Sequence, residues 1–262
     1  MYAVNGCSEV VPIGVSSHEP RAAGASAQAR FELERRRWQL RRRALLPVMT
    51  AIGVLAMTLT FLLVWAISAP WVAFIAGLAV LMGVVGFLLR LPADALFWDR
   101  GAQGERRTSA LLEPLLAEGF VLLHDRRVPS HRENIDTLAV GPTGLFVIET
   151  KNLSGRVSFV GGRLLVGEQR RDTFIEQVYR QATTVQVALA DQLNPLHLSV
   201  SGVLCIHGHR ATFDRQLHGV HVVSGSKLRD AVAGGSRLLD DEQIQVLARA
   251  LDERLPEPYS WE

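Results

Sequence analysis

A run of 46 consecutive residues without a charged side chain, from Ala44 to Leu89, constrains this chain more than any other feature. The hydrocarbon core of a bilayer is about 30 Å thick and takes roughly 20 apolar residues of helix to cross. The run is long enough to cross twice. Ser68-Ala69-Pro70 divides it into two candidate spans, about 45–67 and 71–89, and a short junction ending in proline suits a turn between antiparallel helices.

Positive charge borders this run on both sides. Arg90 follows it, and seven arginines stand just before it, between residues 30 and 43: Arg30, Arg35, Arg36, Arg37, Arg41, Arg42 and Arg43. Trp65 and Trp71 lie beside the turn, where an interfacial aromatic belt would fall. The positive-inside rule then places both ends of the hairpin in the cytoplasm. We expect a two-pass protein of the cell membrane, with the lipid bilayer as a partner, rather than a helical hairpin buried inside a soluble protein.

The residues before the hairpin fall into two parts. Residues 1–29 are rich in Gly, Ala, Ser and Pro without an apolar period, which predicts disorder. Residues 30–43 read as a short basic helix that either lies on the membrane surface or serves as a positively charged flank. We therefore divide the chain into a disordered and basic segment at 1–43, a transmembrane hairpin at 44–91 and a cytoplasmic domain at 92–262.

The basic excess of the whole chain belongs to the N-terminal part. Residues 1–91 carry 9 arginines and 4 acids, so residues 92–262 hold 19 of the 28 basic residues and 22 of the 26 acidic ones. The overall pI is thus no argument for nucleic-acid binding. Cys7 and Cys205 are too few and too far apart for a disulfide framework or a metal quartet, so buried or idle thiols are the simpler interpretation.

Residues 92–262 show the pattern of a mixed α/β domain. Apolar periodicity predicts helices over Gln103–Glu118 and Phe174–Leu193, and a last helix capped by Asp240 with Gln243 three residues later. It predicts strands over Phe120–His124, Asn134–Val140, Leu145–Lys151, Leu198–Ile206 and Val220–Val223, with a further hairpin over Gly155–Val166. Gly141-Pro142-Thr143-Gly144 is a turn signal between two of these strands.

Charged residues interrupt the most strand-like segment of this domain. Glu149 and Lys151 are separated by one residue and project from the same face of their strand, and Asp136 stands near the start of the preceding one. Charge in a buried strand is costly without a purpose. Two carboxylates can bind a hard cation such as Mg²⁺, and a metal-bound water can hydrolyse a phosphodiester with a lysine nearby. By spacing alone, however, this triad is a weak signal.

The surrounding residues resemble the nuclease-related domain (NERD) family of the PD-(D/E)XK nuclease-like superfamily. The resemblance covers roughly residues 100–225 and is carried by Gly104-Glu105, Asn134-Ile135-Asp136, Glu149-Thr150-Lys151-Asn152 and Ser154-Gly155. Ile135 stands where the superfamily motif has Pro. The resemblance implies an α/β fold, a mixed sheet flanked by helices, here preceded by the transmembrane hairpin.

The resemblance also implies roles for individual residues. Asp136 and Glu149 would bind Mg²⁺ or Mn²⁺ with the Thr150 carbonyl as a third ligand. Lys151, Glu149, Asp136 and Glu105 would be catalytic, and Gln177 would lie near the substrate. The function implied is a membrane-anchored, metal-dependent nuclease acting on DNA or another nucleic acid. The alternative is a catalytically inactive module that serves as a membrane-bound nucleic-acid-binding or protein scaffold.

Each of these residues also has a structural explanation. Glu105 could be a first-turn acid favoured by the helix dipole, Lys151 could form a structural ion pair with Glu149, and Gln177 could be an ordinary helix residue. His207, His209, His218 and His221 fit no standard zinc spacing, and no cysteine joins them.

Overall fold

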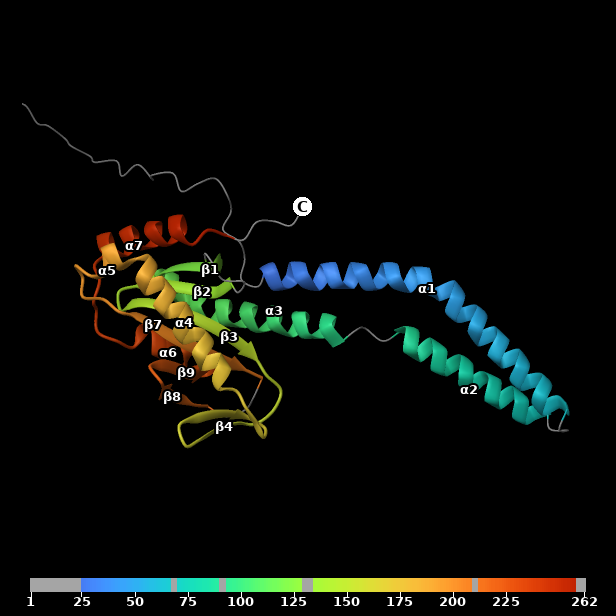
Figure 1. Cartoon of the computed structure of the whole chain (residues 1–262). Helices are drawn as coiled ribbons and strands as arrows, with labels where there is room; N and C mark the ends of the chain where they lie inside the picture. Colours follow the sequence, from blue (N-terminus) through green and yellow to red (C-terminus); the bar gives the residue numbers. More distant parts are fainter. Residues whose placement is uncertain (1–24, 67–69, 90–92, 129–133, 209–211, 258–262) are drawn as a thin grey trace, which may run out of the picture.

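The computed structural model describes residues 25–66, 70–89, 93–128, 134–208 and 212–257. Two long helices come first, α1 (Ala25–Ala66) and α2 (Pro70–Leu89), and a mixed α/β domain follows (Figure 1). Its helical segments are α3 (Ala93–Leu112), η1 (Glu113–Glu118), α4 (Asp172–Ala188), α5 (Ala190–Leu193), η2 (Gly225–Lys227), α6 (Leu228–Ala233) and α7 (Asp241–Arg254). Its strands are β1 (Val121–Arg127), β2 (Asn134–Gly141), β3 (Gly144–Asn152), β4 (Val157–Val160), β5 (Arg163–Val166), β6 (Gln169–Arg170), β7 (Val200–His207), β8 (Asp214–Leu217) and β9 (Val220–Ser224).

Helix α1 packs against α2 over one part of its length and against α3 over another (Figure 1). It is bent, and Pro47 lies inside it. A proline removes a backbone N–H and its ring clashes with the carbonyl four residues earlier, which bends a helix. Helix α1 therefore joins the expected basic segment, the first apolar segment and residues 25–29 in one element. Most of the segment expected to be disordered, residues 1–24, lies outside the described residues.

The two long helices carry the apolar run. α2 has 20 residues and none of them is charged. None of the helices in the described part of the chain combines the length and the apolarity needed to cross a membrane.

The main sheet has six strands in the order β1-β2-β3-β7-β9-β8. β1, β2 and β3 are antiparallel neighbours joined by short connections, and β3, β7 and β9 run parallel. β8 returns antiparallel beside β9. A parallel pair needs a crossover connection, and α4 supplies the one between β3 and β7. A second, three-stranded antiparallel sheet, β4-β5-β6, stands apart within that crossover.

Helices cover the main sheet on both faces. α4 packs on β3, β7 and β9, and α7 packs on β1 and β2; the shared core includes Leu138, Val147, Val185 and Leu247. α3 and α6 cover the other face over Phe146, Ile148, Val203 and Val223. Strand β3 is buried on both sides from Gly144 to Thr150. A strand buried on both faces has room for a charged side chain only where partners are provided.

Most expected elements are present, with several corrections. The helix expected at Gln103 begins at Ala93 instead, and its last turn is a 3₁₀ segment ending at Gly119, whose φ of 86° suits a glycine. The helix expected over Phe174–Leu193 is divided at Leu189. Strands β6 and β8 and helix α6 were not expected. The capping box of Asp240 and Gln243 is confirmed, because each side chain bonds the backbone N–H of the other residue.

Candidate active site at the open ends of β2 and β3

Three acidic residues fall at the same level of three neighbouring strands. The β2–β3 ladder ends at the pair Thr137–Ile148, so one step further in the same register Asp136 lies opposite Glu149. On the other side of β2 the β1 ladder continues past Asp125, which is opposite Asp136 in that register. Asp125 has a φ of 53°, in the left-handed region where a non-glycine residue is strained. β3 is an interior strand, so the site lies at the strand ends, away from the lateral edge of the sheet.

Glu149 is held by side chains of α4 and by its own strand. Its Oε1 accepts hydrogen bonds from Lys151 Nζ at 2.6 Å and Gln177 Nε2 at 2.8 Å, and its Oε2 accepts from Gln181 Nε2 at 3.0 Å. The residue is only 3% exposed. A carboxylate offers about four acceptor positions, so three are used and one is left.

Lys151 projects on the same side of β3 as Glu149, as the alternation of the strand requires. Its side chain is 23% exposed, and its Nζ lies 5.2 Å from the ring centre of Phe174 on α4. The ammonium is therefore placed between a buried carboxylate, an aromatic face and solvent. The expected pairing of Glu149 and Lys151 is present; the ion pair does not by itself decide between a catalytic and a structural role.

Asp136 and Thr150 are joined directly. The backbone N–H of Thr150 donates to Asp136 Oδ2 at 2.7 Å, so the side chain takes the position of a backbone acceptor where the β2–β3 ladder has ended. Burial raises the pKa of Asp136 well above its usual value, and the Glu149 and Glu105 carboxylates raise it further. The charges of these three acids therefore interact closely.

Glu105 brings a third element to the same place. It lies on α3, and burial, followed by the charges of Asp125 and Glu149, raises its pKa to about 7. The residue is in the interior of α3, which begins at Ala93. The explanation of Glu105 as a first-turn acid stabilised by the helix dipole is therefore wrong, because that effect is confined to the first turn.

Close contact between α3 and β3 sets the position of Glu105. A Cβ on Gly104 would lie 2.9 Å from the Asn152 Cβ, so only glycine allows the helix this near. Thr108, one turn after Glu105, accepts a hydrogen bond from the Thr150 hydroxyl at 2.9 Å and lies 2.8 Å from His207 Nε2. Asn152 Nδ2 also donates to the backbone carbonyl of Arg100 at 2.9 Å.

Cys205 takes part in the same contacts between α3 and the sheet. Its Sγ lies 3.5 Å from His207 Nε2 and 3.8 Å from the Thr108 hydroxyl. Burial raises the pKa of the thiol to about 12, so it stays protonated. A thiol in this state is neither a nucleophile nor a metal ligand at neutral pH. The expectation of a buried thiol is confirmed at Cys205, while Cys7 is outside the described residues.

The acidic side chains of this site are of the chemical type that binds a hard divalent cation. Asp136, Glu149 and Glu105 supply carboxylate oxygens, the ligand type that Mg²⁺ and Mn²⁺ prefer. Burial, and after it the neighbouring carboxylates, raise the pKa values of Glu105 and Asp136, and a bound cation would lower these pKa values. Within the described part of the chain, no group of three or more His, Cys, Asp or Glu side chains has the arrangement of a metal site. Thr150 stands between Glu149 and Lys151. Its N–H donates to Asp136, and its hydroxyl donates to Thr108.

Three contributors were missed by the sequence interpretation. Asp125 becomes visible only once the β1–β2 register is known. Gln181 follows Gln177 by four residues, so the helical period alone places both side chains on one face, and this signal was available. Thr108 could have been linked to Glu105 by the same rule, but not to Thr150 or His207, which are distant in the chain.

A comparison with family models finds a match over the part of the chain that holds these residues. Neither the curated proteins nor the solved structures contain a match to the chain. Residues 100–207 match the nuclease-related domain, from α3 to the end of β7, and so include Glu105, Asp136, Glu149, Lys151 and Gln177. Together, the mixed sheet flanked by helices and this match show that residues 100–207 are a nuclease-related domain.

Proposed function

We propose that this protein is a membrane-anchored nuclease that hydrolyses phosphodiester bonds in DNA or another nucleic acid with the help of Mg²⁺ or Mn²⁺. The observation that carries the proposal is the convergence of Glu105 from α3, Asp136 from β2 and Glu149 from β3, with Lys151 beside them, inside the nuclease-related domain. Perturbed pKa values in such a cluster are typical of active sites.

Each residue has a proposed role that follows from its chemistry. Asp136 and Glu149 would hold the cation with the Thr150 carbonyl, and Glu105 would complete the negative site. A bound divalent cation supplies a nucleophilic water at neutral pH and stabilises charge on the phosphate. Lys151 cannot ligate a metal as an ammonium; it would orient the attacking water or stabilise the developing negative charge. Gln177 and Gln181 hold the Glu149 carboxylate in place, and Gln177 is the residue proposed to reach the substrate.

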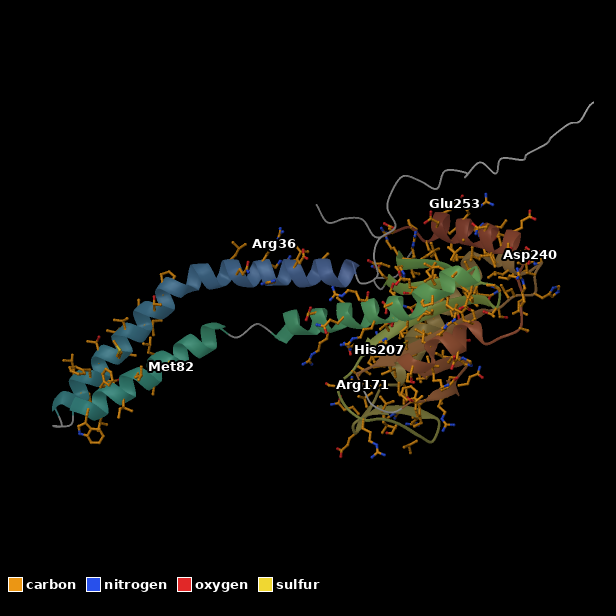
Figure 2. All side chains as sticks on the ribbon, turned by 180° about the vertical axis from the view of Figure 1, so that it is seen from behind. Arg36, Met82, Arg171, His207, Asp240 and Glu253 are labelled. Carbon is orange, nitrogen blue, oxygen red and sulfur yellow. The ribbon has the colours of Figure 1, made fainter. Side chains whose placement is uncertain are left out.

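The membrane anchor is a separate part of the proposal. Many large apolar side chains on α1 and α2 are exposed, including Leu63, Trp71, Phe74 and Met82, each at least 63% exposed (Figure 2). An apolar surface of this extent marks a membrane or protein interaction site. The proposal of an anchor rests on these side chains and on the charge-free run from Ala44 to Leu89. It does not rest on a membrane span, because none is found among the described helices. Both termini and the nuclease-related domain would then be cytoplasmic.

A second candidate is an inactive, membrane-bound scaffold or nucleic-acid-binding module. One observation favours it: Lys151, Gln177 and Gln181 already donate three hydrogen bonds to the Glu149 carboxylate, which leaves only one of its acceptor positions. A network of this kind can be purely structural.

Nuclease assays of the full-length protein in detergent separate the two candidates. Single- and double-stranded DNA and RNA are incubated with the protein in Mg²⁺, in Mn²⁺ and in EDTA, beside an Asp136→Asn variant. Cleavage that requires the cation and is lost in the variant supports the nuclease. Calorimetric titration with both cations runs in parallel. An absence of cleavage together with an absence of cation binding supports the scaffold. Alkaline carbonate extraction of membranes tests the anchor independently, and release of the protein into the soluble fraction would contradict it.

A further inference from the structure

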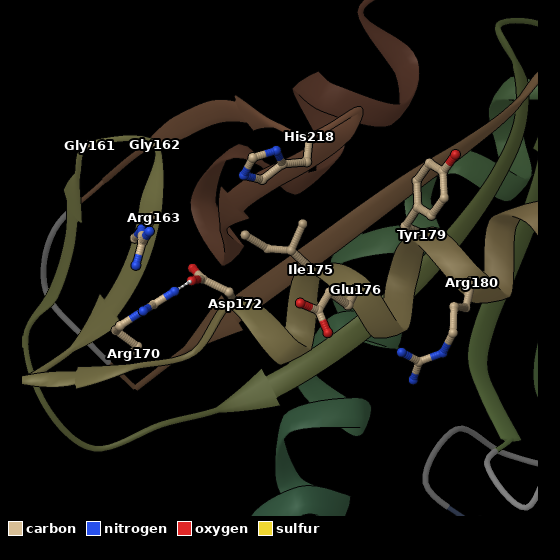
Figure 3. Close-up of a pocket in the computed structure, with 10 residues that line it drawn as sticks. All are labelled: Gly161, Gly162, Arg163, Arg170, Asp172, Ile175, Glu176, Tyr179, Arg180 and His218. Atoms are coloured by element: carbon tan, nitrogen blue, oxygen red, sulfur yellow. Dashed lines mark hydrogen bonds and ion pairs between the residues drawn. The ribbon is translucent and has the colours of Figure 1, made fainter.

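A pocket of about 730 Å³ lies between the β4–β5 hairpin, α4 and the β8–β9 turn (Figure 3). Its volume is in the range of about 300–1,000 Å³ that is usual for ligand sites. The expected site residues do not line it. We refer to it as the α4 pocket.

Basic side chains dominate the α4 pocket. Arg163 from β5, Arg170 from β6, Arg180 from α4 and His218 from the β8–β9 turn line it, with Asp172 and Glu176 as the acids. Arg170 is paired with Asp172 at 2.9 Å, and the second Asp172 oxygen accepts from the backbone N–H of Leu164. The Arg163 and Arg180 side chains form no hydrogen bond or ion pair with the residues that the structure describes. These two guanidinium groups are therefore able to donate hydrogen bonds to a bound anion.

Two further features suit a nucleic-acid strand. Tyr179 lines the pocket and is 57% exposed, so its ring is open to stacking, and bases stack on such rings. Gly161 and Gly162 form the rim at the β4–β5 turn, where their φ values of 57° and 74° suit glycine and they place no side chain over the pocket. His218 has a φ of 49°, a strained conformation at the turn that brings it to the pocket.

Helix α4 connects the pocket with the acidic cluster. Gln177 and Gln181 face Glu149 from one side of this helix, while Ile175 and Tyr179 face the pocket from another. Positive charge continues between the two places, because both Lys151 and Arg171 lie over the Phe174 ring, at 5.2 and 5.8 Å from its centre. Arg171 adjoins Arg170 in the chain. A strand crossing the N-terminal half of α4 would thus pass Arg170, Arg171 and Lys151, with the acids Asp172 and Glu176 beside them.

We propose that the α4 pocket binds a single nucleic-acid strand, with Arg163 and Arg180 contacting phosphates and Tyr179 stacking on a base, so that the neighbouring phosphodiester lies at Lys151. This inference rests on the proposed nuclease function and adds to it where the substrate is held. Arginine is suited to phosphate because its planar fork donates two parallel hydrogen bonds.

The test measures binding without cleavage. Fluorescence anisotropy of a labelled single-stranded oligonucleotide is titrated with full-length protein in detergent and EDTA, where no cation supports hydrolysis. We expect Arg163→Gln and Arg180→Gln each to weaken binding and to reduce the slope of log K against log salt by about 0.7, the value for one phosphate contact on a single strand. Tyr179→Leu should weaken binding about 5-fold or more, and Tyr179→Phe should restore it.

The matched control is Arg249→Gln. Arg249 is an exposed arginine on α7, which lies at the opposite end of the domain from β4 in Figure 1. Its removal should leave both the affinity and the salt slope unchanged. Circular dichroism melts confirm that each variant is folded.

The outcomes separate this inference from the nuclease proposal. If Lys151→Ala loses cleavage but binds as the wild type, while the pocket variants lose binding, both are supported. If the pocket variants bind and cleave like the wild type, the pocket assignment is overturned and the nuclease stands. A wild type that binds through these residues without cleaving supports the pocket alone. Two results would overturn the single-strand assignment. One is displacement of the oligonucleotide by millimolar inorganic phosphate alone. The other is a Tyr179→Leu variant that binds both duplex and single strand with the affinity of the wild type.

Discussion

The backbone N–H of Thr150 donates to the Asp136 carboxylate over 2.7 Å, at the point where the β2–β3 ladder has ended. A side-chain oxygen thereby replaces a backbone carbonyl and keeps two adjacent strand ends in contact. The same residue, Thr150, bonds Thr108 on α3 through its hydroxyl. Thr150 therefore joins β2, β3 and α3, the three elements that bring Asp136, Glu149 and Glu105 together.

Asp136→Asn should weaken cation binding more than it weakens the fold. The amide oxygen can still accept from the Thr150 N–H, but the site loses one negative charge and one carboxylate ligand. Calorimetric titration of Mg²⁺ and Mn²⁺ into the full-length variant should show at least a 10-fold loss of affinity. Asp241→Asn, at an acid that is 89% exposed on α7, is the control and should bind as the wild type. Equal affinity in both variants would remove Asp136 from the site.

The stability of the cation-free protein should fall as the pH rises from about 4.5 to about 7. The pKa of Glu105 is raised from 4.5 to about 7 by burial and by Asp125 and Glu149, so the folded state binds more protons than the unfolded state in this window. Asp136 acts in the same direction. The loss should be about 1–3 kcal/mol at most, allowing for partial exposure.

Thermal melts in EDTA at pH 5, 6 and 7.5 measure this dependence. Mg²⁺ should restore stability at pH 7.5 and have little effect at pH 5, because it binds only the deprotonated acids. Glu105→Gln should flatten the profile. A wild-type profile that rises across this pH range would contradict the crowding of charge at the site.

Thr108→Val should destabilise the domain and displace Glu105. The variant keeps the shape of the side chain but removes the acceptor of the buried Thr150 hydroxyl and the contact of the Thr108 hydroxyl with His207 Nε2, at a cost of about 1–3 kcal/mol. Thr183→Val is the matched control, since Thr183 is exposed and bonds only the backbone of its own helix. Chemical or thermal unfolding should place the control within about 0.5 kcal/mol of the wild type. Equal stability of the two variants would show that the polar link between α3 and β3 contributes nothing.

The domain from Ala93 to the C-terminus should fold without the two long helices. Its three hydrophobic clusters draw on buried residues between Leu112 and Leu255, so the core does not depend on α1 or α2. The contact between α1 and α3 is lost, which should loosen the first turns of α3. A soluble fragment with a cooperative melt is expected. An aggregated fragment without a melting transition would show that the helices are part of the folding unit.

Much of this arrangement could be predicted from local patterns. The alternation and turn residues of Asn134–Lys151 predicted β2 and β3 almost to their ends, because a buried strand pair joined by a tight turn is specified within one short segment. The pairing of Asp136 with Glu149 follows from that register. The capping box at Asp240 is equally local.

Other features depend on tertiary contacts. The start of α3 was placed ten residues too late, since its first turns have no clear apolar period and lie beside α1. Strand β8 carries four polar or half-buried residues and is defined by its pairing with β9. The α4 pocket combines residues from β5, β6, α4 and the β8–β9 turn, and no spacing in the sequence indicates that Arg163 and His218 meet.

Cleavage by the Lys151→Ala variant is the most direct test of the proposed function. Full-length wild type and variant are compared in detergent for Mg²⁺-dependent cleavage of a nucleic-acid substrate that the wild type cuts, with thermal melts of the same samples. We predict that the variant binds Mg²⁺ and that its free energy of unfolding lies within about 1 kcal/mol of the wild-type value. Its cleavage rate should fall by about 100-fold or more, because Lys151 acts on the reaction. A variant that is destabilised by about 1–3 kcal/mol and still cuts would make Lys151 the structural partner of Glu149 and contradict the catalytic assignment.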